Sequence, residues 1–85
     1  MPEISRFLGI VICMYYDEHN PPHFHAKYGK YEITIEINSG VITGKFPRRA
    51  MKAVLDWYSL HKDELIKDWE LAVSDQPLNK IEPLE

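Results

Sequence analysis

The sequence predicts an α+β fold, in which a four-stranded antiparallel meander is followed by two helices packed on one of its faces. Three observations favour this architecture. Apolar and alternating segments fill the first half of the chain, glycine-containing turns separate them, and a helical repeat of apolar residues fills most of the second half. With 85 residues, a single domain spanning 1–85 is expected.

The first half contains two clear strand signals. The run GIVICMYY (9–16) is continuously apolar and rich in β-branched and aromatic residues, which is typical of a strand in the centre of a sheet. The segment YEITIEI (31–37) alternates strictly, so its isoleucines share one side and its Glu32, Thr34 and Glu36 side chains share the other. This alternation predicts a half-buried strand.

Two glycine-containing pairs are expected to close the hairpins. A two-residue turn at Gly29-Lys30 places His23 opposite Glu36 and His25 opposite Thr34. A second two-residue turn, at Ser39-Gly40, places Ile37 opposite Ile42. Both turns assign the same apolar face to the interior, and a slip of one residue would reverse it.

The helical segment begins after Pro47, which is suited to the first position of a helix. The apolar repeat continues from Arg48 to Val73, and a single helix of that length would measure about 39 Å. Because so small a domain is narrower than this, we expect a break between Ser59 and Asp63 that gives two helices. The ending QPLNKIEPLE (76–85) has two prolines and no period, so it is expected to be an extended strap or a frayed end.

Composition narrows the class of protein. The net charge is −3, with a basic excess up to Leu55 and an acidic excess beyond it, which argues against a uniformly basic nucleic-acid binder. The single cysteine, Cys13, excludes an internal disulfide and a cysteine-based zinc finger. No apolar run is long enough to cross a bilayer and no leader is recognisable, so we expect a full-length cytoplasmic protein.

Histidines cluster in the segment DEHNPPHFHAKYG (17–29). Two residues apart on a strand, His23 and His25 point the same way with a separation of roughly 7 Å, which suits two ligands of one ion. The metal hypothesis takes His19, His23 and His25 as ligands, with Asp17 or Glu36 as substitutes for His19, and favours zinc or another divalent ion.

Two other interpretations of these histidines stay open. In a catalytic site, His23 and His25 would act as acid or base with Glu36 orienting them. In a purely structural interpretation, the two histidines are polar side chains on the solvent face of a strand, and Glu36 only pairs with His23.

A basic group lies at the start of the helical segment, formed by Lys45, Arg48, Arg49 and Lys52. Cations are disfavoured at a helix N-terminus, whereas an anion held there by nearby arginines is stabilised. These residues therefore predict a phosphate or nucleic-acid site, or else a solvated basic end that pairs with the acidic segment DELIKDWE (63–70).

Several of these stretches resemble a small bacterial domain family of unknown function, numbered 4160. The resemblance rests on the first 32 residues, MPEISRFLGIVICMYYDEHNPPHFHAKYGKYE, and on GKFPRRA, LHKDELIKDWELA and PLNKIEPLE. It implies a bacterial protein encoded beside another small protein, in an arrangement similar to toxin–antitoxin pairs.

The first functional expectation is therefore a protein-binding module that works with a small partner encoded nearby. The alternatives are a metal-dependent or histidine-based hydrolase or nuclease, and a nucleic-acid-binding regulator that uses the basic helix start. Whether the protein is an enzyme, and whether it forms a homodimer across an open sheet edge, are left open.

Overall fold

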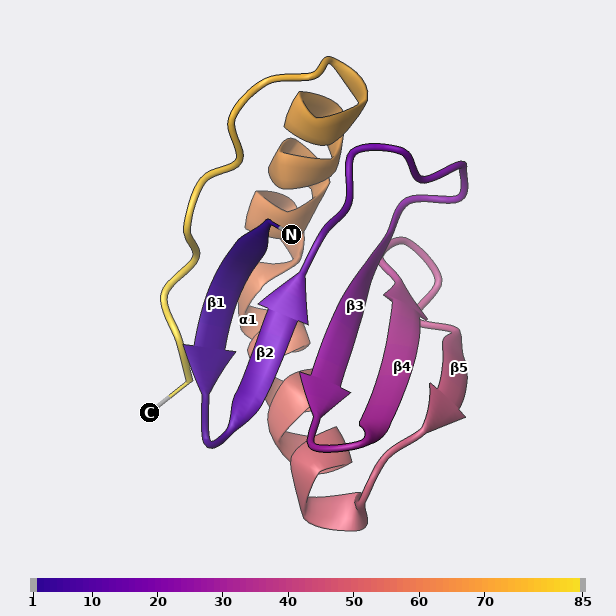
Figure 1. Ribbon diagram of the computed structural model, residues 1–85, viewed down its shortest axis with the longest axis vertical. Coiled ribbons are helices and arrows are strands. Elements are labelled where there is room, and N and C mark those ends of the chain that lie inside the picture. Colours follow the sequence, from indigo (N-terminus) through magenta and orange to yellow (C-terminus); the bar gives the residue numbers. More distant parts are fainter. Residues whose placement is uncertain (1, 85) are drawn as a thin grey trace.

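The computed structural model describes residues 2–84, which form one antiparallel sheet and one long helix (Figure 1). The strands lie in the sheet in their order along the chain, and the helix crosses one face of the sheet. The elements are β1 (Glu3–Phe7), β2 (Ile10–Cys13), β3 (His23–Tyr28), β4 (Tyr31–Glu36), β5 (Ile42–Lys45) and α1 (Arg48–Val73). The predicted α+β class and the meander are confirmed.

The predicted number of four strands is wrong, because β1 precedes the segment in which the first strand was expected. β1 pairs with β2 through a two-residue turn at Leu8-Gly9, with Phe7 opposite Ile10. Both turn residues have positive φ, 52° for Leu8 and 78° for Gly9. Turns of this kind normally carry Asn or Asp before the glycine. Because leucine takes that position, the sequence alone does not indicate this hairpin.

The hairpin between β3 and β4 is confirmed residue by residue. His23 lies opposite Glu36 and His25 opposite Thr34, and the pairing continues to Tyr28 opposite Tyr31. Gly29 has the positive φ, 57°, that this tight turn requires.

The predicted Ser39-Gly40 turn between β4 and β5 is wrong. Ile35, not Ile37, lies opposite Ile42, so the pairing is shifted by two residues and the connection is longer. The Ile37 amide donates to the Pro22 carbonyl at 2.9 Å, which takes Ile37 out of the ladder and into the core. Because the shift is even, the apolar face stays on the inside.

Gly44 allows β5 to lie close to β4. Its φ is 108°, and a Cβ at this position would lie 2.5 Å from the Glu32 carbonyl oxygen. Any side chain there would clash with the backbone of the neighbouring strand.

The prediction of two helices is also wrong, because α1 is one helix with a kink. His61 has non-helical backbone angles, φ −122° and ψ 24°, and lies inside the stretch in which the break was expected. The longest dimension of the protein is 34 Å, shorter than the roughly 39 Å of a straight helix with this number of residues, so a bend is needed. Among residues 2–84, no helix combines the length and the apolar character that a bilayer span requires.

The core lies between the inner face of the sheet and α1, with Trp57 at its centre. Trp57 is fully buried and packs against the rings of Phe7 and Phe24, with ring centroids 5.6 and 5.7 Å away. Its indole Nε1 donates to the Glu82 carbonyl at 2.8 Å. The side chain therefore joins the helix, the sheet and the C-terminal segment.

The C-terminal segment, residues 76–84, is an extended strap, which is one of the two forms expected from the sequence. It runs back along β1, where the Ile81 amide donates to the Ile4 carbonyl at 2.8 Å (Figure 1). The Lys80 ammonium donates to the Glu3 carbonyl at 2.7 Å. Ile81 itself is buried in the core, so the segment covers the outer edge of β1.

Asp68, on α1, fixes the start of this strap from inside the protein. It is fully buried, and its Oδ1 accepts a hydrogen bond from the Asn79 amide at 2.9 Å, while its Oδ2 has no partner among the described residues. Burial raises the pKa of the Asp68 carboxyl above its ordinary value, against the Asn79 hydrogen bond, which lowers it. The folded protein therefore holds this proton more tightly than the unfolded chain does.

Stability is consequently expected to fall as the pH rises from the ordinary pKa of 3.8 through the raised value in the folded protein. We expect the variant Asp68→Asn to lose this decline and to gain about 1 kcal/mol at neutral pH, because no charge is buried. Urea denaturation as a function of pH measures both effects. Asp63→Asn, on the exposed side of α1, is the matched control and should keep the decline. An Asp68→Asn variant with an unchanged pH profile would contradict the assignment.

Candidate metal centre

The two strand histidines lie side by side at the start of β3. Their side chains are only 16% and 13% exposed for His23 and His25, less than expected for a solvent-facing strand. The Trp69 ring lies 5.3 Å from the His23 ring, and the Tyr15 ring meets His25 edge-on at 4.6 Å. Aromatic rings therefore hold both imidazoles in place.

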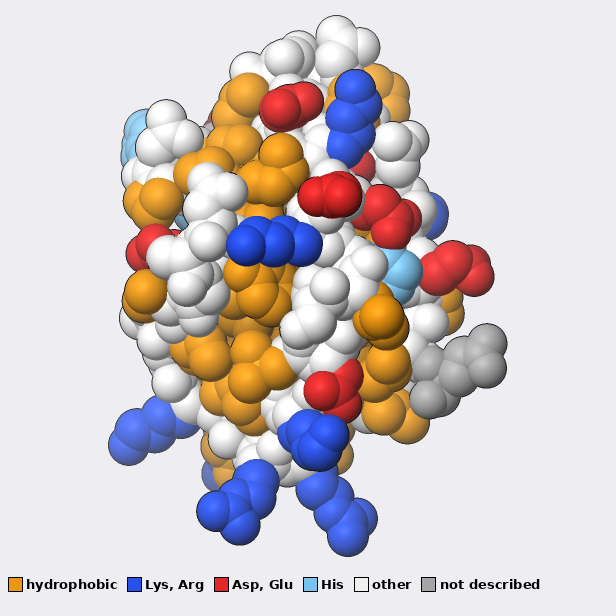
Figure 2. All heavy atoms as spheres, turned by 180° about the vertical axis from the view of Figure 1, so that it is seen from behind, with side chains coloured by type: hydrophobic (Ala, Val, Ile, Leu, Met, Phe, Trp, Pro, Cys, Tyr) orange, Lys and Arg blue, Asp and Glu red, His pale blue; other side chains and the backbone are white. Residues whose placement is uncertain are grey.

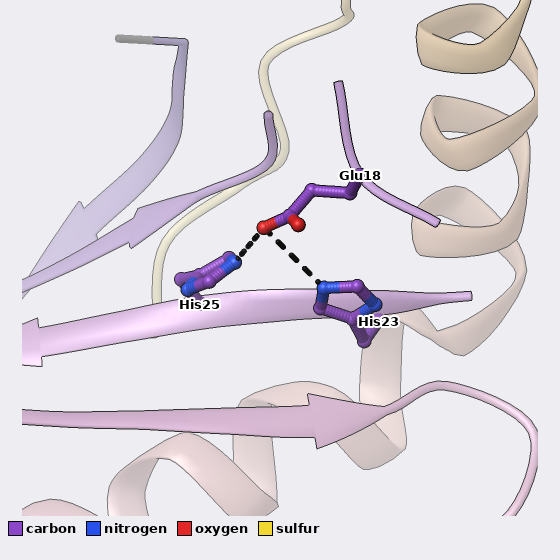
Figure 3. A group of neighbouring side chains, drawn as sticks. All are labelled: Glu18, His23 and His25. Atoms are coloured by element: carbon purple, nitrogen blue, oxygen red, sulfur yellow. Dashed lines mark hydrogen bonds and ion pairs between the residues drawn. The ribbon is translucent and has the colours of Figure 1, made fainter. Parts of the chain in front are cut away.

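The third member of the group is Glu18, from the loop between β2 and β3. Its Oε1 lies 2.5 Å from the Nε2 atom of His25 and 3.4 Å from the Nε2 atom of His23. Figure 3 shows the carboxylate reaching over the strand toward both rings. One ligand atom from each of the three residues lies within 4.8 Å of the others. Two nitrogens and one carboxylate oxygen thus converge on a single point.

The other ring nitrogens are held by acceptors. The Nδ1 atom of His23 donates to the Pro21 carbonyl at 2.8 Å, and that of His25 donates to the Glu32 carboxylate at 3.0 Å. A carbonyl and a carboxylate can only accept, so each Nδ1 carries a hydrogen. In the neutral imidazoles both Nε2 atoms then present lone pairs to Glu18.

This arrangement can hold either a shared proton or a metal ion. A lone pair that faces a carboxylate is repelled unless a proton or a metal ion lies between them. Burial alone would raise the pKa of the Glu18 carboxyl, but the hydrogen bonds and charges of His25 and His23 outweigh it and hold that pKa below its ordinary value. Glu18 is therefore available as a carboxylate ligand over most of the pH range.

The spacing fits a small divalent ion. Bonds of about 2.0–2.1 Å to nitrogen and oxygen place tetrahedral ligand atoms roughly 3.3 Å apart. The 3.4 Å between Glu18 and His23 matches this separation. The contact with His25 must lengthen, which Glu18 can allow because it lies on a loop. Three protein ligands leave at least one coordination position for water or substrate.

Glu32 and Pro21 complete the second layer of the site. Metal-binding histidines usually donate their other nitrogen to a carboxylate or a backbone carbonyl, which fixes the tautomer and the ring orientation. His25 has the first arrangement and His23 has the second. These are the outer hydrogen bonds that a metal centre would use.

The remaining residues of the predicted site lie apart from this group. His19 is exposed and is not among the three described residues that converge, and Asp17 is exposed as well. Glu36 lies opposite His23, but its carboxylate accepts a hydrogen bond from the Ser39 hydroxyl at 2.9 Å. The structure thus brings His23 and His25 together and replaces His19 and Glu36 with Glu18 and Glu32.

Sequence reasoning could have found Glu32 but not Glu18. Glu32 is on the same face of β4 as Thr34, so it is the diagonal neighbour of His25, and a long side chain spans that separation. Glu18 belongs to a loop, and the loop path determines whether it or His19 turns toward β3. The alternating pattern of a strand does not extend to a loop, so it cannot show which of the two residues turns toward β3.

The basic residues of the predicted anion site lie together at the start of α1. Lys45, Arg48, Arg49 and Lys52 are all exposed. Lys52 is paired with Asp56 on the same helix at 3.0 Å. Arg49 also lines a cleft of about 280 Å³, whose other walls are mainly apolar. Lys45 lies opposite Glu32, the residue that bonds His25, whereas Arg48, Arg49 and Lys52 belong to α1.

The chain belongs to the family described as Domain of unknown function (DUF4160), whose profile matches residues 9–70. The matched range contains Glu18, both strand histidines and Glu32. No curated protein and no solved structure matches the chain.

Proposed function

We propose that this member of the DUF4160 family binds one divalent transition-metal ion, zinc in the first place, through Glu18, His23 and His25, and uses it for hydrolysis. The observation that carries the proposal is the convergence of two Nε2 lone pairs and one carboxylate on a point, with both Nδ1 atoms held by acceptors. A structural zinc site would be closed by a fourth protein ligand, whereas three ligands are typical of catalytic sites.

A bound ion would polarise a substrate oxygen and lower the pKa of a coordinated water. The residues of the chain have separate tasks. His23 and His25 supply neutral imidazoles, Glu18 supplies one negative charge, and Glu32 and Pro21 keep the rings aimed at the ion. Because the site lies on the surface of the sheet, it suits a substrate larger than the protein's own clefts.

Metal titration tests this proposal. The untagged protein, freed of metal by a chelator, is titrated with zinc, nickel and manganese by calorimetry. We expect one ion per chain and an affinity for manganese below those for nickel and zinc. The double variant His23→Ala/His25→Ala should bind at least about a hundredfold more weakly. His19→Ala is the matched control and should bind within about twofold of the parent protein.

Each part of the proposal can fail separately. A parent protein that takes up no ion, or a double variant that binds as tightly as the parent, contradicts the metal site. If zinc binds as expected but the loaded protein does not cleave a chromogenic phosphodiester or ester faster than the double variant, the hydrolytic role is contradicted and binding alone remains.

Other expectations stay predictions. The small protein partner and the toxin–antitoxin-like arrangement are implied by the family resemblance, as is a bacterial origin, whereas the cytoplasmic location is a prediction from the composition. Nucleic-acid binding at Lys45, Arg48, Arg49 and Lys52 is a prediction from charge. Co-expression with the neighbouring gene product, followed by purification of a complex, is the direct test of the partner.

A further inference from the structure

An apolar cleft of about 280 Å³ opens where the turn between β1 and β2 meets the start of α1. Its buried walls are Ile10 of β2 and two small side chains of α1, Ala50 and Ala53, which are three residues apart. Its other apolar walls are Leu8 and Tyr28, whose side chains are 65% and 37% exposed. Large exposed apolar side chains beside an apolar hollow are typical of an interaction surface.

The Tyr28 wall of the cleft is fixed by its neighbours. A Cβ atom at Gly9 would lie 3.3 Å from the Cε1 atom of Tyr28, so the ring packs directly against the turn. The ring centroid of Phe46 lies 6.1 Å from that of Tyr28. Because the folded chain already holds this wall in place, a ligand would lose little free energy in ordering it.

Leu8 is poorly suited to its position for folding alone. Its φ of 52° lies in the left-handed region, which residues other than glycine, asparagine and aspartate rarely adopt. Its side chain is mostly exposed, so it adds little to the core. An asparagine before Gly9 would form the same turn more easily. A residue that breaks a local rule in this way is expected where it serves a contact outside the fold.

Cations without carboxylate partners lie around the cleft. Arg49 lines it, and Arg48 and Lys30 are exposed beside the two elements that form it. Within the described part of the chain, none of these three side chains forms an ion pair, whereas Lys52 pairs with Asp56 at 3.0 Å. Figure 2 shows Lys and Arg side chains gathered at the lower end of the molecule, where Figure 1 places both turns and the start of α1. This end is therefore complementary to an acidic partner.

The size and the chemistry of the cleft narrow the class of ligand. Its volume is at the lower limit of sites for small molecules, which measure roughly 300–1,000 Å³, so it suits one side chain of a larger partner. The buried side chains of Ile10, Ala50 and Ala53 carry no polar group. A nucleotide base between them would leave its polar edges without hydrogen bonds, whereas an aliphatic or phenyl side chain has none to lose.

We propose that this cleft binds an acidic segment of a partner protein. One apolar side chain of the segment enters the cleft beside Leu8, and the carboxylates that flank it pair with Arg48 and Arg49. An apolar centre with a charged rim is the usual composition of a small protein interface. The proposal shares no residue with the metal centre and does not depend on it.

Selection from a phage-displayed library of random dodecapeptides tests the proposal. The immobilised full-length chain is expected to select peptides in which one large apolar residue is flanked by Asp or Glu. The same library is passed over the double variant Leu8→Asn/Arg49→Glu, which should not select this pattern. A parent protein that selects no such peptides overturns the proposal, and so does a double variant that selects them equally well.

A synthetic peptide with the selected sequence separates the two contacts by fluorescence anisotropy. Leu8→Asn should weaken binding at least about tenfold, while its midpoint of urea denaturation stays at or above that of the parent, because asparagine suits the turn. Arg49→Glu should also weaken binding at least about tenfold, and the affinity of the parent should fall as salt is added. Leu60→Asn is the matched control and should bind within about twofold of the parent, because Leu60 is 70% exposed but is not among the described residues that line the cleft.

Two further outcomes would contradict the proposal. If Leu8→Asn binds the selected peptide as tightly as the parent does, no apolar side chain enters the cleft beside Leu8. If a single-stranded DNA oligonucleotide binds in place of any acidic peptide, and Arg49→Glu weakens that binding while Leu8→Asn does not, this end of the molecule is a nucleic-acid site.

Discussion

Replacing Trp57 with alanine is expected to cost about 3–5 kcal/mol of the free energy of unfolding. A domain of this size has roughly 4–13 kcal/mol in total, so the variant should be unfolded or close to it at body temperature. The reason is that Trp57 is fully buried and contacts Phe7, Phe24 and the kink residue His61, whose ring centroid is 5.5 Å away. Its removal leaves a cavity where helix, sheet and strap meet.

Urea denaturation measures this loss of stability. Two further variants separate the contribution of the hydrogen bond from that of packing and provide a control on the exposed side of the helix. Trp57→Phe keeps most of the packing but loses the hydrogen bond to the Glu82 carbonyl, so it should cost about 1 kcal/mol from that bond alone, with a further packing loss. Leu60→Ala removes an exposed side chain of the same helix and should change stability by less than about 0.5 kcal/mol. A Trp57→Ala variant within about 1 kcal/mol of the parent, well below the expected loss, would show that the core is centred elsewhere.

The second large effect concerns the orientation of the proposed metal ligands. Glu32→Ala is expected to weaken zinc binding by about 10–100-fold, because His25 loses the carboxylate that holds its Nδ1 hydrogen. The change should leave the fold intact, since Glu32 is exposed on the outer face of β4. This prediction rests on the proposed metal site, and calorimetric titration of the folded variant measures it.

Glu36 provides a close control for this experiment. It lies on the same strand and the same face as Glu32, but its carboxylate is bonded to Ser39. Glu36→Ala should therefore leave zinc affinity within about twofold of the parent. If Glu36→Ala weakened binding and Glu32→Ala did not, Glu36 would be the orienting residue that the alternating pattern of β4 suggested. Equal effects of both variants would indicate a general influence of charge on the site.

The alternation of apolar and polar residues was sufficient to predict how β3 and β4 pair at the centre of the sheet. The pairing of β3 with β4 follows from one turn and one apolar face, because a slip of a single residue would bury Glu32, Thr34 and Glu36. The next hairpin shows the limit of this reasoning. A shift of two residues keeps the same face inside, so the pattern could not distinguish the predicted Ile37–Ile42 pair from the observed Ile35–Ile42 pair. The deciding contact, from Ile37 to Pro22, joins two loops.

The other features of the fold and of the candidate site depend on contacts between residues far apart in the sequence, which no local sequence pattern contains. β1 follows from a turn whose first residue, Leu8, is a poor choice for positive φ. The position of the helix bend near His61 was predictable from length, whereas its form as a kink within one helix was not. At the candidate site, the two histidines followed from strand geometry. The identity of the carboxylates depended on a loop path for Glu18 and on a diagonal contact for Glu32.

The strap also determines how the sheet meets other molecules. Without it, β1 would present unpaired amides and carbonyls to solvent, and such an edge can recruit a strand from a neighbouring chain. The bond from Ile81 to Ile4 closes part of that edge. At the far side of the sheet, Lys45 and the unusual backbone of Gly44 disfavour a flat strand addition. A segment with no regular secondary structure thus protects the folded protein against aggregation through its sheet.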